Sequence, residues 1–337
     1  MLRKLVNSGF LFAVILLGLL VIVKKVNKPS SINSNTDGVA HTQTSVNVSV
    51  IYGPDDRQDT YQVSDERLKS LASSTVGLFK AYQISEDTKT KVSSLQTSNF
   101  GESYDLCPDE PYRDQPSGAF CSGSLVGPDL IATAGHCITS EDVCKSTKFV
   151  FGFSISKEGT DPTKVSSNEV YGCQKLLGRE QVGTGADYAV IKLDRVVKNH
   201  TALKINRSGM IAKDTPLVVI GHPCGLPTKI SGGAKVRSTG SSGFFVANLD
   251  TYGGNSGSAV FNAVTGQIEG ILVRGETDFV YNSTKGCRES NRVPDDGGRG
   301  EDVTSISEAA AHIPSGMFQQ SPTMEILRRE VHDLHFD

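Results

Sequence analysis

The stretch Asn248-Leu-Asp-Thr-Tyr-Gly-Gly-Asn-Ser-Gly-Ser258 is the one around which the rest of this chain is arranged. Gly253, Gly254 and Gly257 surround Ser256, and glycine accepts positive φ angles, so the backbone here can aim several amides at one point. A serine hydroxyl is a weak nucleophile until a base takes its proton and amides hold the resulting oxyanion. Glycine- and serine-rich runs between apolar strands are also ordinary turns. This stretch alone therefore leaves both interpretations open.

Two upstream motifs offer the missing chemistry. Thr133-Ala-Gly-His-Cys137 places His136 directly after an apolar strand, and Gly185-Ala-Asp-Tyr-Ala-Val-Ile-Lys-Leu193 places Asp187 where a strand begins. Asp187 could also be an ordinary turn residue at the start of a strand, and that is the explanation we give Asp194, which follows the same strand. A base, a carboxylate and a hydroxyl so far apart in sequence can act together only if the fold brings them together. The chain order is also the reverse of the α/β-hydrolases, which need Gly-x-Ser-x-Gly, whereas Ser258 occupies the second glycine position here.

Together the three motifs resemble those of the trypsin/chymotrypsin-like serine peptidases, most closely the bacterial V8-like (glutamyl-endopeptidase-type) branch. The matching residues are TAGHC at 133–137, GADYAVIKL at 185–193 and GGNSGSAV at 253–260, and residues 51–57 resemble the start of the mature domain. The resemblance covers approximately residues 50–280. It implies an all-β fold of two six-stranded antiparallel β-barrels, at about 50–200 and 201–320, with the active site between them.

The resemblance also implies a role for each site residue. His136 is expected to be the general base, Asp187 to fix its tautomer, and Ser256 to be the nucleophile, with the backbone N–H groups of Gly254 and Ser256 as the oxyanion hole. The expected function is an exported serine endopeptidase that cleaves proteins or peptides through an acyl-enzyme, without a cofactor. The alternative is a catalytically silent binding module on the same fold, which the loss of a triad residue would favour. None is lost here.

Specificity is expected to depend on Asp250, Thr251, Val273, Arg274 and Gly275 around the pocket for the side chain that precedes the scissile bond. An acidic floor at Asp250 favours Lys or Arg, since a buried carboxylate is costly without a cation. Asp250 could instead accept backbone hydrogen bonds, and Arg274 could neutralise it or attract an acidic residue. Glutamate preference in this branch uses a His at the position of Leu272, which weakens that alternative. We expect basic specificity, with acidic or broad specificity as the alternatives.

Asn255 is a departure from the animal digestive members of the family. There an Asp before the nucleophile pairs with a newly cut N-terminus and orders the oxyanion loop. Asn255 carries no charge, so we expect hydrogen bonds to order this loop.

The seven cysteines, none within the first 106 residues, suit an oxidising compartment. The resemblance implies a Cys121–Cys137 bridge that pins the histidine loop. Cys144 with Cys173 and Cys107 with Cys287 are further pairings among the many that six cysteines allow, and Cys224 is expected to be the odd thiol. No C-x-x-C pair exists, so no metal site is expected.

The N-terminal residues differ in kind from the rest. Residues 1–28 contain an apolar run, Gly9–Val23, between clustered cations and without a small-x-small cleavage site, which indicates an export signal that can remain as a membrane anchor. Residues 29–49 read as a polar linker. We therefore expect an extracytoplasmic protein, secreted or periplasmic, that meets a membrane only through this segment. The net charge of −3 argues against nucleic-acid binding, and a monomer is expected.

Local patterns predict the remaining elements. Many short apolar runs with glycine turns between them are typical of a barrel or sandwich. Ser64 is expected to cap a short helix over Asp65–Ala72. Residues 282–320 read as loop, and residues 321–337 as a C-terminal helix that begins at Ser321-Pro322.

Overall fold

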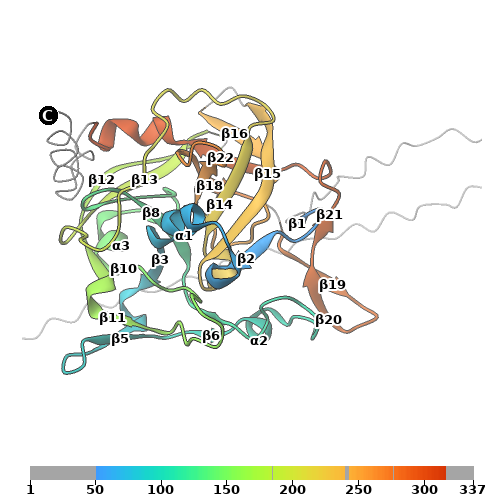
Figure 1. Ribbon diagram of the computed structural model, residues 1–337, viewed down its shortest axis with the longest axis horizontal. Coiled ribbons are helices and arrows are strands. Elements are labelled where there is room, and N and C mark those ends of the chain that lie inside the picture. The colour runs from blue at the N-terminus through green and yellow to red at the C-terminus, as the bar shows by residue number, and fades with distance from the viewer. Residues whose placement is uncertain (1–50, 184, 240–242, 276, 316–337) are drawn as a thin grey trace, which may run out of the picture. The chain divides into compact units, whose positions relative to one another are not determined.

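Residues 51–315, except 184, 240–242 and 276, are described in the computed structural model (Figure 1). All of the described residues belong to one compact unit of the chain. The predicted export signal (1–28), the polar linker (29–49) and the predicted helix over 321–337 lie outside the described residues.

Six antiparallel strands close the first barrel in the order β10-β12-β13-β9-β8-β3. They are β3 (Thr75–Lys80), β8 (Cys121–Gly127), β9 (Leu130–Thr133), β10 (Thr147–Val150), β12 (Val170–Gln181) and β13 (Asp187–Leu193). Apolar side chains fill its interior, with Leu78, Leu125, Ile131, Phe149 and Ile191 fully buried. Burial of this kind is the main favourable contribution to the stability of such a barrel.

A second ring of six antiparallel strands follows in the order β14-β17-β18-β22-β16-β15, and pairing of β14 with β15 closes it. The strands are β14 (Pro216–Gly221), β15 (Lys229–Thr239), β16 (Phe244–Ala247), β17 (Ala259–Asn262), β18 (Ile268–Arg274) and β22 (Glu301–Ser305). Their inward residues form a separate core that includes Val236, Phe245, Val260, Leu272 and Val303. The predicted fold of two six-stranded barrels is confirmed, and Figure 1 shows the second barrel in yellow to red.

The start of the described chain joins the second barrel. Strand β1 (Ile51–Tyr52) runs parallel to β21 (Arg292–Val293), and β2 (Arg57–Asp59) adds to the edge of β15 (Figure 1). Residues 51–59 therefore pair with strands far later in the sequence.

Short elements connect and cover the barrels. They are η1 (Thr60–Gln62), α1 (Glu66–Ser73), η2 (Ala81–Gln83), β4 (Ile84–Asp87), β5 (Val92–Leu95), β6 (Ser98–Asn99), α2 (Phe100–Tyr104), β7 (Pro116–Ser117), α3 (Glu141–Lys145), β11 (Lys164–Ser166), η3 (Ser167–Glu169), η4 (Pro223–Gly225), β19 (Phe279–Asn282), β20 (Cys287–Ser290) and η5 (Ile306–His312).

Two local predictions were wrong. Asp65, not Ser64, caps α1, because its carboxylate accepts hydrogen bonds from the amides of Arg67 and Leu68. Residues 282–320 are not simply loop, since β22 lies there and completes the second barrel. A sequence pattern does not reveal β22, because apolar and polar residues do not alternate along it. Most of its residues are polar, and all of them are buried.

Three disulfides link Cys107 to Cys287, Cys121 to Cys137 and Cys144 to Cys173, and Cys224 is the free, buried cysteine, as predicted. Disulfides form and persist in oxidising compartments outside the cytoplasm. Among the described residues, helices are too short or too polar to cross a membrane.

Candidate active site

The histidine loop follows β9 and is fixed at both sides of His136. Gly135 lies where any side chain would collide with the backbone carbonyls of Glu180 and Tyr188, so a residue without a Cβ is required there. Arg179 Nε donates a 2.7 Å hydrogen bond to the Gly135 carbonyl. On the other side of His136, the disulfide from Cys137 to Cys121 ties the loop to β8.

Asp187, the first residue of β13, holds His136 through two hydrogen bonds. Its Oδ2 lies 2.7 Å from His136 Nδ1, and its Oδ1 accepts from the His136 amide at 3.0 Å. Burial alone would raise the pKa of Asp187, but the hydrogen bonds and charge of His136 outweigh burial and lower it. An ionised carboxylate at Nδ1 keeps the proton on that nitrogen and leaves Nε2 free to act as a base.

Thr304 is a residue of this site that the sequence analysis missed. It lies on β22 in the second barrel, and its Oγ1 accepts a 3.0 Å hydrogen bond from the Asp187 amide. It thereby holds the backbone of Asp187 from the second barrel. Nothing in the local sequence around Thr304 distinguishes it from any other strand threonine.

Ser256 lies on a sharp turn packed against the histidine loop. Gly254 and Gly257 have φ angles of +85° and +90°, in the region that favours glycine. A Cβ on Gly257 would overlap the Ser122 carbonyl and the Thr133 hydroxyl, which shows how closely this turn approaches β8 and β9. The Ser256 carbonyl accepts a 2.8 Å hydrogen bond from the Ser122 amide and lies 3.6 Å from Cys137 Sγ. The serine turn and the histidine loop are thus adjacent.

Two backbone amides of this turn donate no hydrogen bond to the described part of the protein. Within the described part of the chain, the N–H groups of Gly254 and Ser256 donate to no protein acceptor, whereas the Asn255 N–H between them donates to the Tyr252 carbonyl at 3.0 Å. In the same part of the chain, Ser256 Oγ and His136 Nε2 form no hydrogen bond. Such bonds commonly tighten only when substrate binds.

Asn255 is buried, and its Oδ1 accepts a 3.0 Å hydrogen bond from the Ser258 hydroxyl. The Ser258 amide also donates to the Asn255 carbonyl at 2.8 Å. These contacts within the turn occupy the side chain that would otherwise be available to a distant group.

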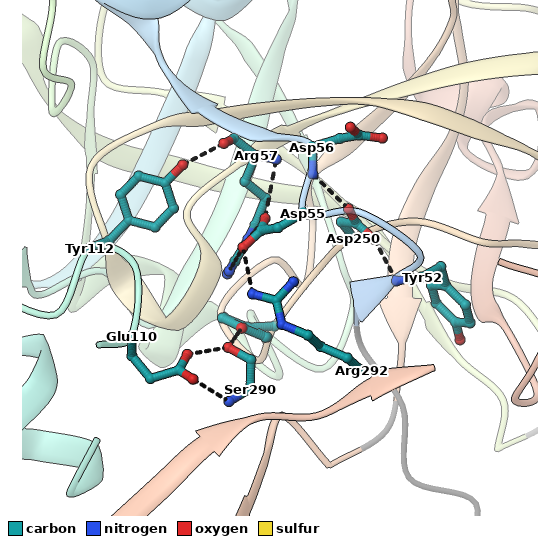
Figure 2. A network of polar contacts seen from close by, with 10 residues as sticks. Tyr52, Asp55, Asp56, Arg57, Glu110, Tyr112, Asp250, Ser290 and Arg292 are labelled. Atoms are coloured by element: carbon teal, nitrogen blue, oxygen red, sulfur yellow. Dashed lines mark hydrogen bonds and ion pairs between the residues drawn. The ribbon is translucent and has the colours of Figure 1, made fainter. Parts of the chain in front are cut away.

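A cavity of about 170 Å³ opens beside Ser256. Four of the five predicted specificity residues line it, namely Thr251, Val273, Arg274 and Gly275. Asp250 does not line it: its two carboxylate oxygens accept hydrogen bonds from the amides of Tyr52 (2.7 Å) and Asp56 (3.0 Å), as Figure 2 shows. Among the described residues, the acidic ones in the cavity wall are Asp278 and Glu301, which the sequence analysis did not select.

The N-terminal segment supports the cavity wall from outside. Arg57 is buried, pairs with Asp55 at 2.7 Å, and places its guanidinium 4.1 Å from the ring centre of Tyr252, a residue of the wall. Tyr112 donates to the Arg57 carbonyl, and Asp55 also meets Arg292 (Figure 2). The carboxylate of Asp55 bonds Arg57 Nε and Nη2, and the ring of Tyr252 faces the guanidinium, whereas Nη1 is buried without a hydrogen-bond partner.

His136 also lies close to the sulfurs of Cys121 and Cys137, a grouping that could suggest a metal site. Those two sulfurs are joined in a disulfide and offer no thiolate ligand.

Residues 121–271 match the family described as the trypsin-like peptidase domain. Over those residues the chain is similar to a trypsin-like peptidase domain. The matched residues contain His136, Asp187 and Ser256, and the resemblance predicted from the three motifs is confirmed.

Similar proteins cover parts of this chain. Human chymotrypsin-like elastase family member 3B is 27% identical over 114 residues, 32% of this chain and 42% of that protein. Glutamyl endopeptidase of Bacillus licheniformis is 27% identical over 150 residues, 42% of this chain and 45% of that protein. The chain thus spans less than half the length of these relatives. A solved structure of Glu endopeptidase in complex with MPD aligns with a TM-score of 0.45 at 19% identity, over 78% of this chain and 97% of that one.

Proposed function

We propose that the protein is an exported serine endopeptidase that hydrolyses proteins or peptides through a His136–Asp187–Ser256 triad. The observation that carries this proposal is the 2.7 Å contact between His136 Nδ1 and Asp187 Oδ2 on a loop packed against the Ser256 turn. An imidazole oriented in this way can remove the serine proton, and a nearby serine on a glycine turn can attack.

Each residue of the site has a defined task in this reaction. Ser256 Oγ attacks the peptide carbonyl while His136 Nε2 accepts its proton, and the free amides of Gly254 and Ser256 bind the oxyanion. His136 then protonates the leaving amine, which leaves an acyl group on Ser256. A water molecule activated by His136 releases the acyl group and restores the serine.

A catalytically silent binding module on the same fold is the alternative. The intact hydrogen bonds of Asp187 and the two open amides favour the peptidase. Backbone N–H groups without acceptors next to a nucleophile serve little purpose in a module that only binds.

Covalent labelling with a fluorophosphonate tests this function without knowledge of the substrate. We expect rapid, stoichiometric labelling of the folded chain and none of Ser256→Ala. Ser70→Ala, which removes an exposed serine of α1, is the matched control and should label normally. Wild-type protein that is folded but stays unlabelled would identify the binding module instead.

We also propose that residues 1–28 direct export and that their retention anchors the protein. The three disulfides favour an oxidising destination. An antibody against the peptidase domain, used on membrane and medium fractions of the producing cells, distinguishes a retained anchor from a cleaved signal. Protein confined to the cytosol would contradict export.

A further inference from the structure

Glu301 is the deepest acidic residue in the wall of the cavity beside Ser256. It is the first residue of β22, only 1% of its surface is exposed, and it lines the cavity together with Ser256 and Thr251. A carboxylate that reaches a cavity from a buried strand position is fixed by the barrel and has little freedom to turn toward solvent.

The carboxylate of Glu301 is incompletely satisfied. Its Oε1 is buried and has no hydrogen-bond partner. Across the described residues, none of the ion pairs within 4.0 Å involves Glu301. Burial and the charge of Asp278 raise its pKa well above the usual range, against a hydrogen bond from Thr251 and the charge of Arg299. A buried carboxylate with an open oxygen is costly unless a cation or a donor meets it.

The other charged residues of the cavity do not supply that partner. Arg274 lines the cavity, but its guanidinium is engaged by Asp302 Oδ2 at 2.9 Å and by the Gly185 carbonyl at 2.9 Å. Asp278 adds a second carboxyl group, which accepts the Gly253 amide at 2.9 Å. Among the described residues that line the cavity, no cation therefore meets Glu301 Oε1.

Gly275 has no side chain between the cavity and the Glu301 carboxylate. A Cβ built on Gly275 would lie 2.8 Å from Glu301 Cδ and closer still to Oε2. The carboxylate thus lies directly behind a wall position without a side chain. Any larger residue at 275 would occupy the space in front of it.

We propose that Glu301, and not Asp250, selects the residue that precedes the scissile bond, and that this residue is Lys or Arg. The proposal rests on the peptidase function proposed above and assigns its substrate class. A guanidinium or ammonium group in the cavity meets Glu301 Oε1 and favours the ionised carboxylate. Asp250 cannot do this while both of its oxygens are bound to the amides of Tyr52 and Asp56.

Binding to the catalytically inert full chain tests the cavity separately from the chemistry. The probes are benzamidine, which is a cation, and benzamide, its neutral analogue, titrated into Ser256→Ala by calorimetry. We expect benzamidine to bind and benzamide to bind at least roughly 10²-fold more weakly, since removal of one partner of a buried charge pair costs a few kcal/mol. In Ser256→Ala/Glu301→Gln, the difference between the two probes should disappear.

Kinetics on the active chain provide the second test. Peptides that differ only in Arg or its neutral isostere citrulline before the scissile bond isolate the charge. We expect kcat/KM to favour arginine by roughly 10²-fold in the wild type, the preference to vanish in Glu301→Gln, and Glu301→Asp to restore part of it. Asp250→Asn is the matched carboxylate control and should keep the arginine-to-citrulline ratio.

The outcomes separate the two proposals. Benzamidine selectivity that depends on Glu301, in a chain that hydrolyses nothing, would support the cavity assignment and contradict the peptidase function. Hydrolysis that is equally fast after citrulline, glutamate or apolar residues would overturn the assignment and leave the peptidase intact. A preference for arginine that survives Glu301→Gln but is lost in Asp250→Asn would restore Asp250 as the selecting residue. Circular dichroism and thermal melting of each variant establish that it is folded.

Discussion

The amide of Tyr52 donates a 2.7 Å hydrogen bond to Oδ1 of Asp250, which joins the start of the described chain to the residue six positions before Ser256 (Figure 2). Oδ2 of the same carboxylate accepts the Asp56 amide at 3.0 Å. Asp250 thus holds residues 51–59 in place through two backbone amides. Arg57 of this segment in turn packs against Tyr252 in the cavity wall.

Asp250→Ala is expected to destabilise the fold by about 2–4 kcal/mol, because two amides near the protein interior lose their acceptors. The measurement is the free energy of unfolding in urea, together with hydrogen exchange at the amides of Tyr52 and Asp56. Asp56→Ala, which removes an exposed carboxylate and keeps the amide, is the control and should change stability little. Equal free energies of unfolding for Asp250→Ala and wild type would show that these two hydrogen bonds contribute little to stability.

Cleavage near residue 50 should not be required for activity. Tyr52 and Asp56 engage Asp250 through backbone amides that exist whether or not the chain is cut, and Asn255 is bonded to Ser258 within its own turn. We expect a chain with an uncleavable sequence at 46–50 to match the cut chain in kcat/KM and fluorophosphonate labelling. Strict dependence on the cut, rescued by Asn255→Asp, would point to an ion pair with a new N-terminus instead.

Ser256→Ala, His136→Ala and Asp187→Asn should each lower kcat by a factor on the order of 10⁴ or more, because the three residues act as a unit. For the same reason the combined variant should be little worse than Ser256→Ala alone. Steady-state kinetics with one peptide, supported by thermal melting to show intact folds, measures this. Near-normal turnover in His136→Ala would remove His136 from the role of base.

His222 should make the fold sensitive to acid. It is fully buried, its Nδ1 bonds to the Leu226 carbonyl at 2.9 Å, and burial lowers its pKa from 6.5 to about 4. In the unfolded chain His222 therefore becomes protonated below about pH 6.5, whereas in the folded chain it stays neutral until about pH 4. The stability contribution is complete above pH 6.5 and falls by about 3 kcal/mol as the pH drops to 4.

Urea unfolding of wild type and His222→Gln between pH 7 and pH 4 measures this effect. The glutamine variant lacks the titrating ring, so the stability difference between the two proteins should shrink as the pH falls. A difference that stays constant across this range would show that His222 is protonated alike in both states.

Cys224 should be a protected thiol. It is buried and unbridged, and burial raises its pKa well above the usual value, so the reactive thiolate is scarce. Mass spectrometry after iodoacetamide should find slow modification of Cys224 in the folded protein and rapid modification in denaturant. Fast labelling under native conditions, or a quantitative disulfide at Cys224, would contradict this.

Much of the fold and of the site could be predicted from sequence because the signals are local. Apolar runs with glycine turns indicate the strands of a barrel or sandwich. TAGHC and GGNSGS each carry a glycine where a Cβ would collide with neighbouring backbone, at Gly135 and Gly257. The resemblance of these motifs to a known family then supplied the pairing of His136 with Asp187. The free Cys224 followed from an odd count and a loop with no obvious partner.

The sequence by itself determined the order of the candidate triad and the odd thiol, and its resemblance to a known family implied the two barrels. The tertiary structure alone decided which carboxylate reaches the cavity: Asp250 turns to the amides of residues 51–59, and Glu301 enters from a strand that reads as loop. It also decided that Thr304 fixes Asp187. The physical reason is that a strand alternates its side chains between two faces, so the direction of any one of them depends on pairing with strands far away in the chain.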